Sequence, residues 1–124
     1  MGIDFSHTTA QWSYIGFGDF RRALALFEGF ELDDMEGFGG DRDWSTVDTD
    51  LAPLLNHSDC DGELAPEECR RVAPRLRVVI DELWPAERAV WEIDPGAHFN
   101  RHAGLALAAG MDAAAAADEH LQFQ

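Results

Sequence analysis

The sequence has few basic residues, none of them lysine, and no long hydrophobic run. Its 124 residues include 9 basic residues, all arginine, against 24 acidic ones, which gives a formal net charge of −15. A surface of that sign repels phosphate, so direct binding to nucleic acid or to an anionic membrane is not expected. Nothing approaches the roughly 20 apolar residues that span a bilayer, because the alanine-rich run 105–117 is interrupted by Gly110 and Asp112.

Cysteine is scarce as well, and the two cysteines have to be read together with the expected compartment. Residues 1–8 contain neither the basic cluster nor the apolar run of a signal peptide, so we expect a cytoplasmic protein. In the cytoplasm Cys60 and Cys69 are expected to be reduced, although their closeness in sequence would also allow a disulfide between them.

The apolar content is sufficient for one hydrophobic core. Hydrophobic residues make up 46% of the chain and include 4 tryptophans and 8 phenylalanines. A chain of this length usually forms one domain, so we expect residues 1–124 to be a single domain. The periodicity described next predicts a mainly α fold, a compact helical domain of four to five helices with a short terminal β-ribbon.

Two helices are predicted from apolar residues at spacings of three and four. The first contains Phe17, Phe20, Leu24 and Phe27 on one face, and the second contains Val72, Leu76, Val79 and Leu83. Ser13 is a candidate N-cap of the first helix, Gly29 is its expected end, and Arg21 lies off the apolar stripe. The second helix is expected to begin near Pro66, and Pro74 should kink it or divide it into two.

The remaining segments give weaker patterns. The glycine-rich stretch 36–43 is predicted to be a loop, and 46–56 a short helix that enters the following turn. Asp94 followed by Pro95 predicts the start of a long last helix. Its buried side is expected to contain Phe99, Leu105, Ala106, Ala109 and Ala113. Alternating residues at the two chain ends suggest that 2–5 pairs with 121–124 as a ribbon.

The acidic residues are unevenly distributed. Between Glu28 and Glu68 there are fourteen acidic residues and one basic residue, Arg42. Such a segment suits a cation, a basic protein surface, or solubility alone. We therefore expect a protein partner with a basic surface, no direct nucleic-acid contact and no membrane contact.

One stretch resembles the EF-hand calcium loop. In residues 57–68, Asp59, Asp61, Glu63 and Glu68 fall at loop positions 3, 5, 7 and 12, and Gly62 falls at the glycine position 6. The resemblance implies a helix–loop–helix element and a weak calcium site whose candidate ligands are His57, Asp59, Asp61, Glu63 and Glu68. His57 departs from the aspartate of position 1, and imidazole is a poor ligand for calcium. The alternative is a structural turn in which the acids cap the backbone.

A second set of residues suggests zinc instead of calcium. His57 and Cys60 have the two-residue gap common in zinc sites, and Cys69 follows. His98 or His102, four residues apart on one helix face, could supply a fourth ligand. The resulting alternative is a zinc-stabilised structural domain.

Over most of its length the chain resembles small uncharacterised proteins encoded by high-GC actinobacteria and their phages. The likeness rests on Gly2–Phe5, on Trp12–Tyr14, and on the 57–68 loop with the segment 69–76 that follows it. It implies no particular activity. A small acidic binding protein is the favoured function, and an acidic inhibitor that mimics nucleic-acid charge, as phage anti-defence proteins do, is the alternative. An enzyme is not favoured, since no phosphate-binding glycine loop or nucleophile elbow is present.

Overall fold

A computed structural model describes residues 2–57, 62–86 and 95–124, and this part of the chain is mainly helical. Its elements are α1 (Tyr14–Phe27), the 3-10 turns η1 (Leu32–Asp34) and η2 (Trp44–Thr46), α2 (Ala52–Leu55), α3 (Pro66–Leu83) and α5 (Pro95–Ala116). Two short antiparallel sheets accompany them, β1 (Gly2–Asp4) with β2 (Gln11–Ser13), and β3 (Gly62–Leu64) with β4 (Leu121–Phe123). Within the described ranges, none of the helices combines the length and apolarity needed to cross a membrane.

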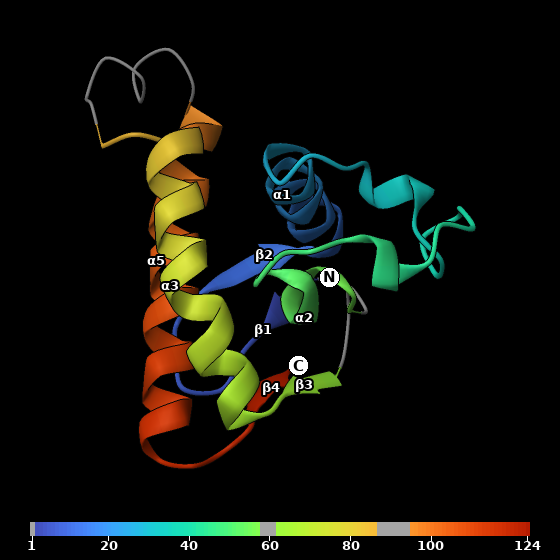
Figure 1. Ribbon diagram of the computed structural model, residues 1–124. Helices are drawn as coiled ribbons and strands as arrows, with labels where there is room; N and C mark the ends of the chain where they lie inside the picture. The colour runs from blue at the N-terminus through green and yellow to red at the C-terminus, as the bar shows by residue number, and fades with distance from the viewer. Residues whose placement is uncertain (1, 58–61, 87–94) are drawn as a thin grey trace.

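Helices α3 and α5 run antiparallel along one side of the molecule and form its largest helix–helix contact (Figure 1). Small residues of α5 allow the close approach. A Cβ atom at Gly104 would lie 2.6 Å from Cδ1 of Ile80 and 3.1 Å from Cζ of Phe20. The core therefore forms where α1, α3 and α5 meet.

The predicted buried face of α5 is wrong at three of its five positions, whereas Leu105 and Ala106 pack half-buried against the core. Phe99 is 50% exposed, and Ala109 and Ala113 are also exposed. The buried positions of the helix are instead Ala97, Ala103, Gly104, Leu107, Ala108, Gly110, Met111, Ala114 and Ala115. An alanine-rich helix has little contrast between its faces, so the sequence does not fix its rotation, and packing decides it.

The prediction for α1 is largely confirmed. Ser13 is the N-cap and accepts a hydrogen bond from the Gly16 amide at 2.9 Å. The helix ends at Phe27, and Gly29 takes a left-handed φ of 93°, which glycine adopts without strain. Two expectations fail. Arg21, read as lying off the apolar stripe, is only 1% exposed, and Phe27, predicted to lie on that stripe, is 40% exposed.

Helix α3 begins at Pro66 as predicted, and it continues through Pro74 as one helix. A proline inside a helix leaves the carbonyl four residues earlier without its donor. Because Pro74 is exposed, water can solvate that carbonyl. Division into two helices is therefore unnecessary.

The helix predicted over 46–56 is mostly absent. Only the four residues of α2 are α-helical there, and the entering helix of the expected helix–loop–helix element is correspondingly short. Leu51 is the N-cap of α2 and makes no capping bond with its side chain, and its amide donates to Thr49 Oγ1 at 3.1 Å. Pro53 then lies in the first turn, where proline is tolerated.

The two chain ends form strands, but the ribbon predicted between 2–5 and 121–124 is reduced to one antiparallel bridge. Strand β1 pairs with the nearby β2, and β4 pairs with β3. The ends meet through a bridge between Phe5 and Phe123 and through three hydrogen bonds. The Gln124 amide donates to the Asp4 carbonyl, the Ser6 amide to the Gln122 carbonyl, and the Gln122 amide to Ser6 Oγ. For β1, a hairpin with the nearby β2 closes a much shorter loop than pairing with the C-terminal strand would, and this costs less chain entropy.

Replacing Gly110 by alanine should destabilise the fold even though alanine favours helices. The new Cβ would lie 2.7 Å from the Thr8 Cβ, and such overpacking costs about 1–3 kcal/mol. Urea denaturation would measure the loss. Gly29→Ala is the comparison variant. Nothing lies within 4 Å of its Cβ position, so any loss of stability there comes from the positive φ and not from steric overlap. An unchanged free energy of unfolding for Gly110→Ala would show that α5 is not held against the 7–8 turn.

Candidate functional site

The predicted calcium ligands contact protein groups wherever the structure describes them. Glu68 Oε1 accepts a hydrogen bond from the Ala65 amide at 2.9 Å and so caps the start of α3. Glu63 Oε2 accepts one from Gln122 Nε2, also at 2.9 Å. Asp59 and Asp61 lie outside the described residues. The two described carboxylates of the loop therefore serve the α3 cap and the contact with β4.

His57 is positioned as a packing residue. Its ring stacks on Phe123 with centroids 4.0 Å apart, and its Nε2 lies 3.2 Å from the Glu63 carbonyl oxygen. A Cβ at Gly62 would lie 2.2 Å from Cε1 of His57, and the φ of Gly62 is 120°. The glycine that suggested a calcium loop is thus also required for the ring of His57 to lie here.

A buried guanidinium holds the start of the same turn. Arg21 donates hydrogen bonds to the carbonyl oxygens of Leu55, at 3.3 Å, and of His57. Its guanidinium carbon also lies 4.9 Å from the ring centroid of Phe17 and 5.5 Å from that of Phe38. Burial, with a smaller repulsion from Arg22, lowers the pKa of Arg21 to about 10, so it remains charged at neutral pH. The guanidinium thus keeps its positive charge beside the carbonyl of His57.

The zinc set is not assembled within the described part of the chain. Cys69 has a free, fully buried thiol whose Sγ lies 3.9 Å from the Leu64 carbonyl oxygen. Burial raises the pKa of this thiol, whereas zinc requires a thiolate. His98 and His102 lie with ring centroids 6.4 Å apart. Among residues 2–57, 62–86 and 95–124, no three His, Cys, Asp or Glu side chains are placed to hold one metal ion, and Cys60 lies outside these ranges.

The exposed acidic residues concentrate on residues 31–50, which we call the acidic arm. In Figure 1 the arm lies on the far side of α1 from the helices α3 and α5. Its eight acidic residues are all exposed, and its one basic residue is Arg42. The acids are Glu31, Asp33, Asp34, Glu36, Asp41, Asp43, Asp48 and Asp50. The arm therefore presents a strongly negative surface.

The acidic arm is an ordered loop with its own packing. The Glu36 amide donates to the Arg42 carbonyl, and the Arg42 amide donates to the Asp34 carbonyl, both at 2.9 Å. The Trp44 ring meets Phe38 edge-on at 5.8 Å, and its Nε1 donates to the Glu36 carbonyl at 3.0 Å. These contacts order the backbone from which the carboxylates project, which lowers the entropy cost of binding a partner.

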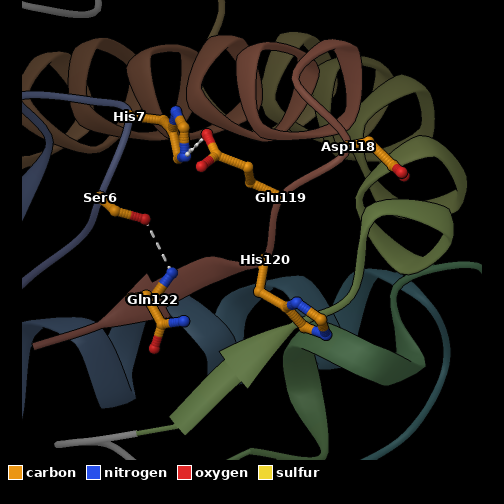
Figure 2. A pocket seen from close by; sticks show the side chains of 6 residues that line it. All are labelled: Ser6, His7, Asp118, Glu119, His120 and Gln122. Atoms are coloured by element: carbon orange, nitrogen blue, oxygen red, sulfur yellow. Dashed lines mark hydrogen bonds and ion pairs between the residues drawn. The ribbon is translucent and has the colours of Figure 1, made fainter.

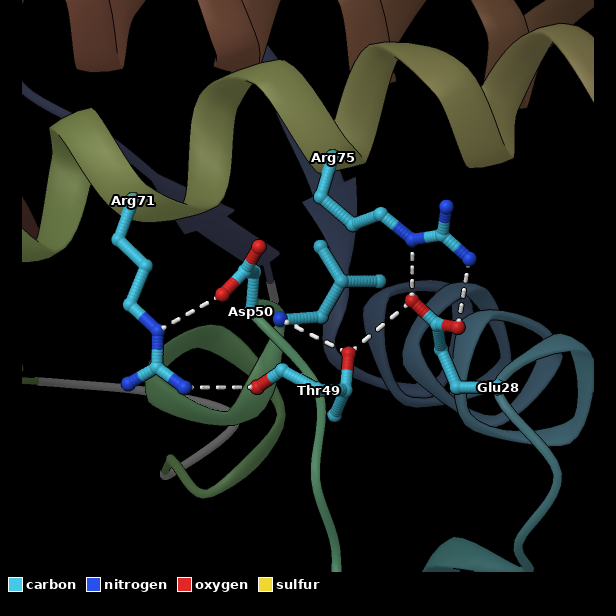
Figure 3. Close-up of polar contacts among 6 residues, drawn as sticks. Glu28, Thr49, Asp50, Arg71 and Arg75 are labelled. Carbon is cyan, nitrogen blue, oxygen red and sulfur yellow. Dashed lines mark hydrogen bonds and ion pairs between the residues drawn. The ribbon is translucent and has the colours of Figure 1, made fainter.

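Two arginines of α3 attach the returning end of the arm to the body (Figure 3). Arg75 donates to both oxygens of Glu28, at 2.7 and 2.9 Å, and Thr49 Oγ1 donates to the same carboxylate at 3.0 Å. Arg71 donates to the Thr49 carbonyl at 3.0 Å and to Asp50 Oδ1 at 3.2 Å. The end of α1, the arm and α3 are thereby joined in one polar network.

A hollow of about 320 Å³ lies between the arm and the start of α3, and we call it the Trp44 hollow. Its polar and aromatic lining consists of Trp44, Asn56, His57, Glu63, Glu68 and Arg71. Three predicted metal ligands thus border one hollow.

A second hollow, of about 480 Å³, lies at the turn from α5 into β4 (Figure 2). His7 Nε2 lies 3.5 Å from Glu119 Oε1 across it. His7 and Asp118 both have positive φ, 64° and 56°. Asp118 ends the helix, since its amide and that of Glu119 return to carbonyls of the last turn of α5. The conformation of Asp118 therefore reflects chain reversal.

Several residues that attach the arm to the body were not predicted from the sequence. Glu28 and Arg75 are 47 positions apart, and no local pattern links them. Arg21 carried no signal of burial.

Comparison with protein-family models, with curated proteins and with solved structures finds no match to this chain.

Replacing Glu28 by glutamine should weaken the fold at neutral pH and flatten its acid sensitivity. Chiefly the hydrogen bonds from Arg75 hold the pKa of Glu28 below its usual value. The stabilisation is therefore complete above the unfolded pKa of about 4.3, and it is lost as pH falls through the lower folded pKa. The variant should lose about 1–3 kcal/mol at pH 7. Urea denaturation from pH 7 to pH 3 measures both effects, with the exposed Glu82→Gln as control. If the free energy of unfolding fell equally with pH in Glu28→Gln and in the unaltered protein, the assignment would be contradicted.

Proposed function

We propose that this chain is a small acidic interaction protein, which docks onto a basic surface of a partner protein through the acidic arm. The observation that carries the proposal is the concentration of eight exposed carboxylates on an ordered projection that contains one arginine. An acidic surface steers a basic partner and orients it as it approaches. An arm held by its own backbone hydrogen bonds and by α3 offers that surface without first having to fold.

The placement of the arginines supports this proposal. Each arginine of the described ranges donates to another group of the protein. Arg77 and Arg101, for example, pair with Asp112 and Asp81 on neighbouring helices. The basic side chains thus serve internal contacts, and the surplus acid faces solvent.

Nucleic-acid mimicry is a narrower form of the same proposal. In that form the partner's basic surface would be a site that otherwise holds phosphates. The arm would compete for that site through its carboxylates. It remains a hypothesis about the partner's identity.

Neutralising three acids of the arm should weaken binding to a basic probe. The triple variant Glu36→Gln, Asp41→Asn, Asp48→Asn removes three exposed charges and leaves the ion pairs of Asp33 and Asp50 intact. Exposed charge pairs contribute on the order of 0.5 kcal/mol each, so affinity for an oligolysine peptide should fall about tenfold. Isothermal titration calorimetry at low ionic strength measures the affinity for the peptide. Added salt should weaken binding of the peptide to the unaltered protein.

The matched control carries the same change in net charge elsewhere. The substitutions Glu67→Gln, Glu82→Gln and Asp118→Asn neutralise three exposed acids outside the arm. This variant should keep most of the affinity. Equal losses in the two triple variants would mean that net charge alone attracts the peptide, and the arm would then have no role of its own.

The calcium hypothesis for residues 57–68 can be tested separately. Because Glu68 caps α3 and Arg21 holds the carbonyl of His57, we expect calcium to leave the melting midpoint of metal-stripped protein unchanged. Selective binding to the folded state would raise that midpoint. A rise with calcium but not magnesium that Asp61→Ala abolishes would establish a calcium loop. A rise with zinc alone would favour the set around Cys60 and Cys69.

A further inference from the structure

The Trp44 hollow joins the acidic arm to the body of the protein. One wall comes from the arm, through Trp44 in η2, and the opposite wall comes from β3 and the first turns of α3. Arg71 lines the same hollow and ties α3 to Asp50 at the end of the arm. The hollow therefore borders the arm, next to any partner segment that lies along the arm.

The lining of the hollow suits a cationic group. Glu63 and Glu68 contribute two negative charges, while the positive charge of Arg71 is offset by Asp50, whose Oδ1 lies 3.2 Å from its Nε. Trp44 contributes a half-buried indole, and indole is the aromatic ring that attracts cations most strongly. An aromatic wall with nearby carboxylates provides both the apolar contact and the charge that a long basic side chain requires.

The size of the hollow limits what it can hold. Its volume is about 320 Å³, which is at the lower end of the range for small-molecule sites. That space suits a single side chain better than a cofactor. Resting on the proposed docking function, we propose that the Trp44 hollow receives one arginine or lysine side chain of the basic partner. Arginine should bind more tightly than lysine, because a planar guanidinium can stack on the indole while it pairs with a carboxylate.

The test uses single amino acids as probes. N-acetyl-arginine methylamide, its lysine counterpart and the uncharged norleucine counterpart are titrated into the isotope-labelled protein. The indole N–H resonance of Trp44, assigned from its loss in Trp44→Phe, should shift with the two cations and not with norleucine. The double variant Glu63→Gln, Glu68→Gln should bind the arginine probe about fivefold or more weakly. Glutamine keeps an oxygen that can accept from Gln122 and from the Ala65 amide.

Glu67→Gln combined with Glu82→Gln is the matched control, because both residues are exposed on α3 and neither lines the hollow. This pair should retain the affinity for the arginine probe. Equal losses in the two pairs, or equal shifts with norleucine, would overturn the proposal. If oligolysine binds through the arm while the single-residue probes leave Trp44 unmoved, the hollow proposal fails and the docking function stands. If oligolysine does not bind, the docking function and the hollow proposal both fail.

Discussion

The pairing of Glu28 with Arg75 holds the acidic arm to the body of the protein. It joins the end of α1 to the middle of α3, and Thr49 brings the returning end of the acidic arm to the same carboxylate. Glu28 is only 10% exposed at its side chain, so its charge needs these donors. A 20-residue projection of like charge repels itself and would tend to separate from the body. The arginines of α3 counter that tendency at its base.

Basic residues are scarce, and most of them contact other groups of the protein throughout the molecule. With 9 basic residues against 24 acidic ones, the position of each arginine decides which surfaces remain acidic. Arg21 lies in the core, where it donates to the carbonyls of Leu55 and His57. Arg22 pairs with Asp33 at the root of the arm. The distal part of the arm is left with Arg42, whose Nε donates to Thr46. The docking proposal thus follows from charge placement, since net charge alone would not distinguish one face from another.

The turn at 57–68 shows how one motif can satisfy two different structures. Glycine with positive φ, an acid at the start of the next helix and an apolar residue between them would suit a calcium loop. They also suit a strand that turns into a capped helix, which is how Gly62, Leu64 and Glu68 are used. Loop spacing constrains the backbone first, and it says little about whether the carboxylates converge on one point. That convergence depends on neighbours such as Gln122, which is distant in sequence.

The sequence by itself determined the elements whose signals are local. The start and end of α1 at Ser13 and Gly29, the start of α3 at Pro66, and the mainly helical character all follow from caps, fixed φ angles and apolar spacing. Such signals act over a few residues, so the local sequence is sufficient to predict these features.

Only the tertiary structure decided the rotation of α5, the partners of the terminal strands, the burial of Arg21 and the construction of the Trp44 hollow. An alanine-rich helix offers no strong preference for one face, and short strands pair with whatever edge packing brings near. The hollow combines residues from 44 to 71, and the arm's anchor combines Glu28 with Arg75. Contacts of that kind are set by the packing of whole elements, because no short-range preference of the chain encodes which distant side chains will meet.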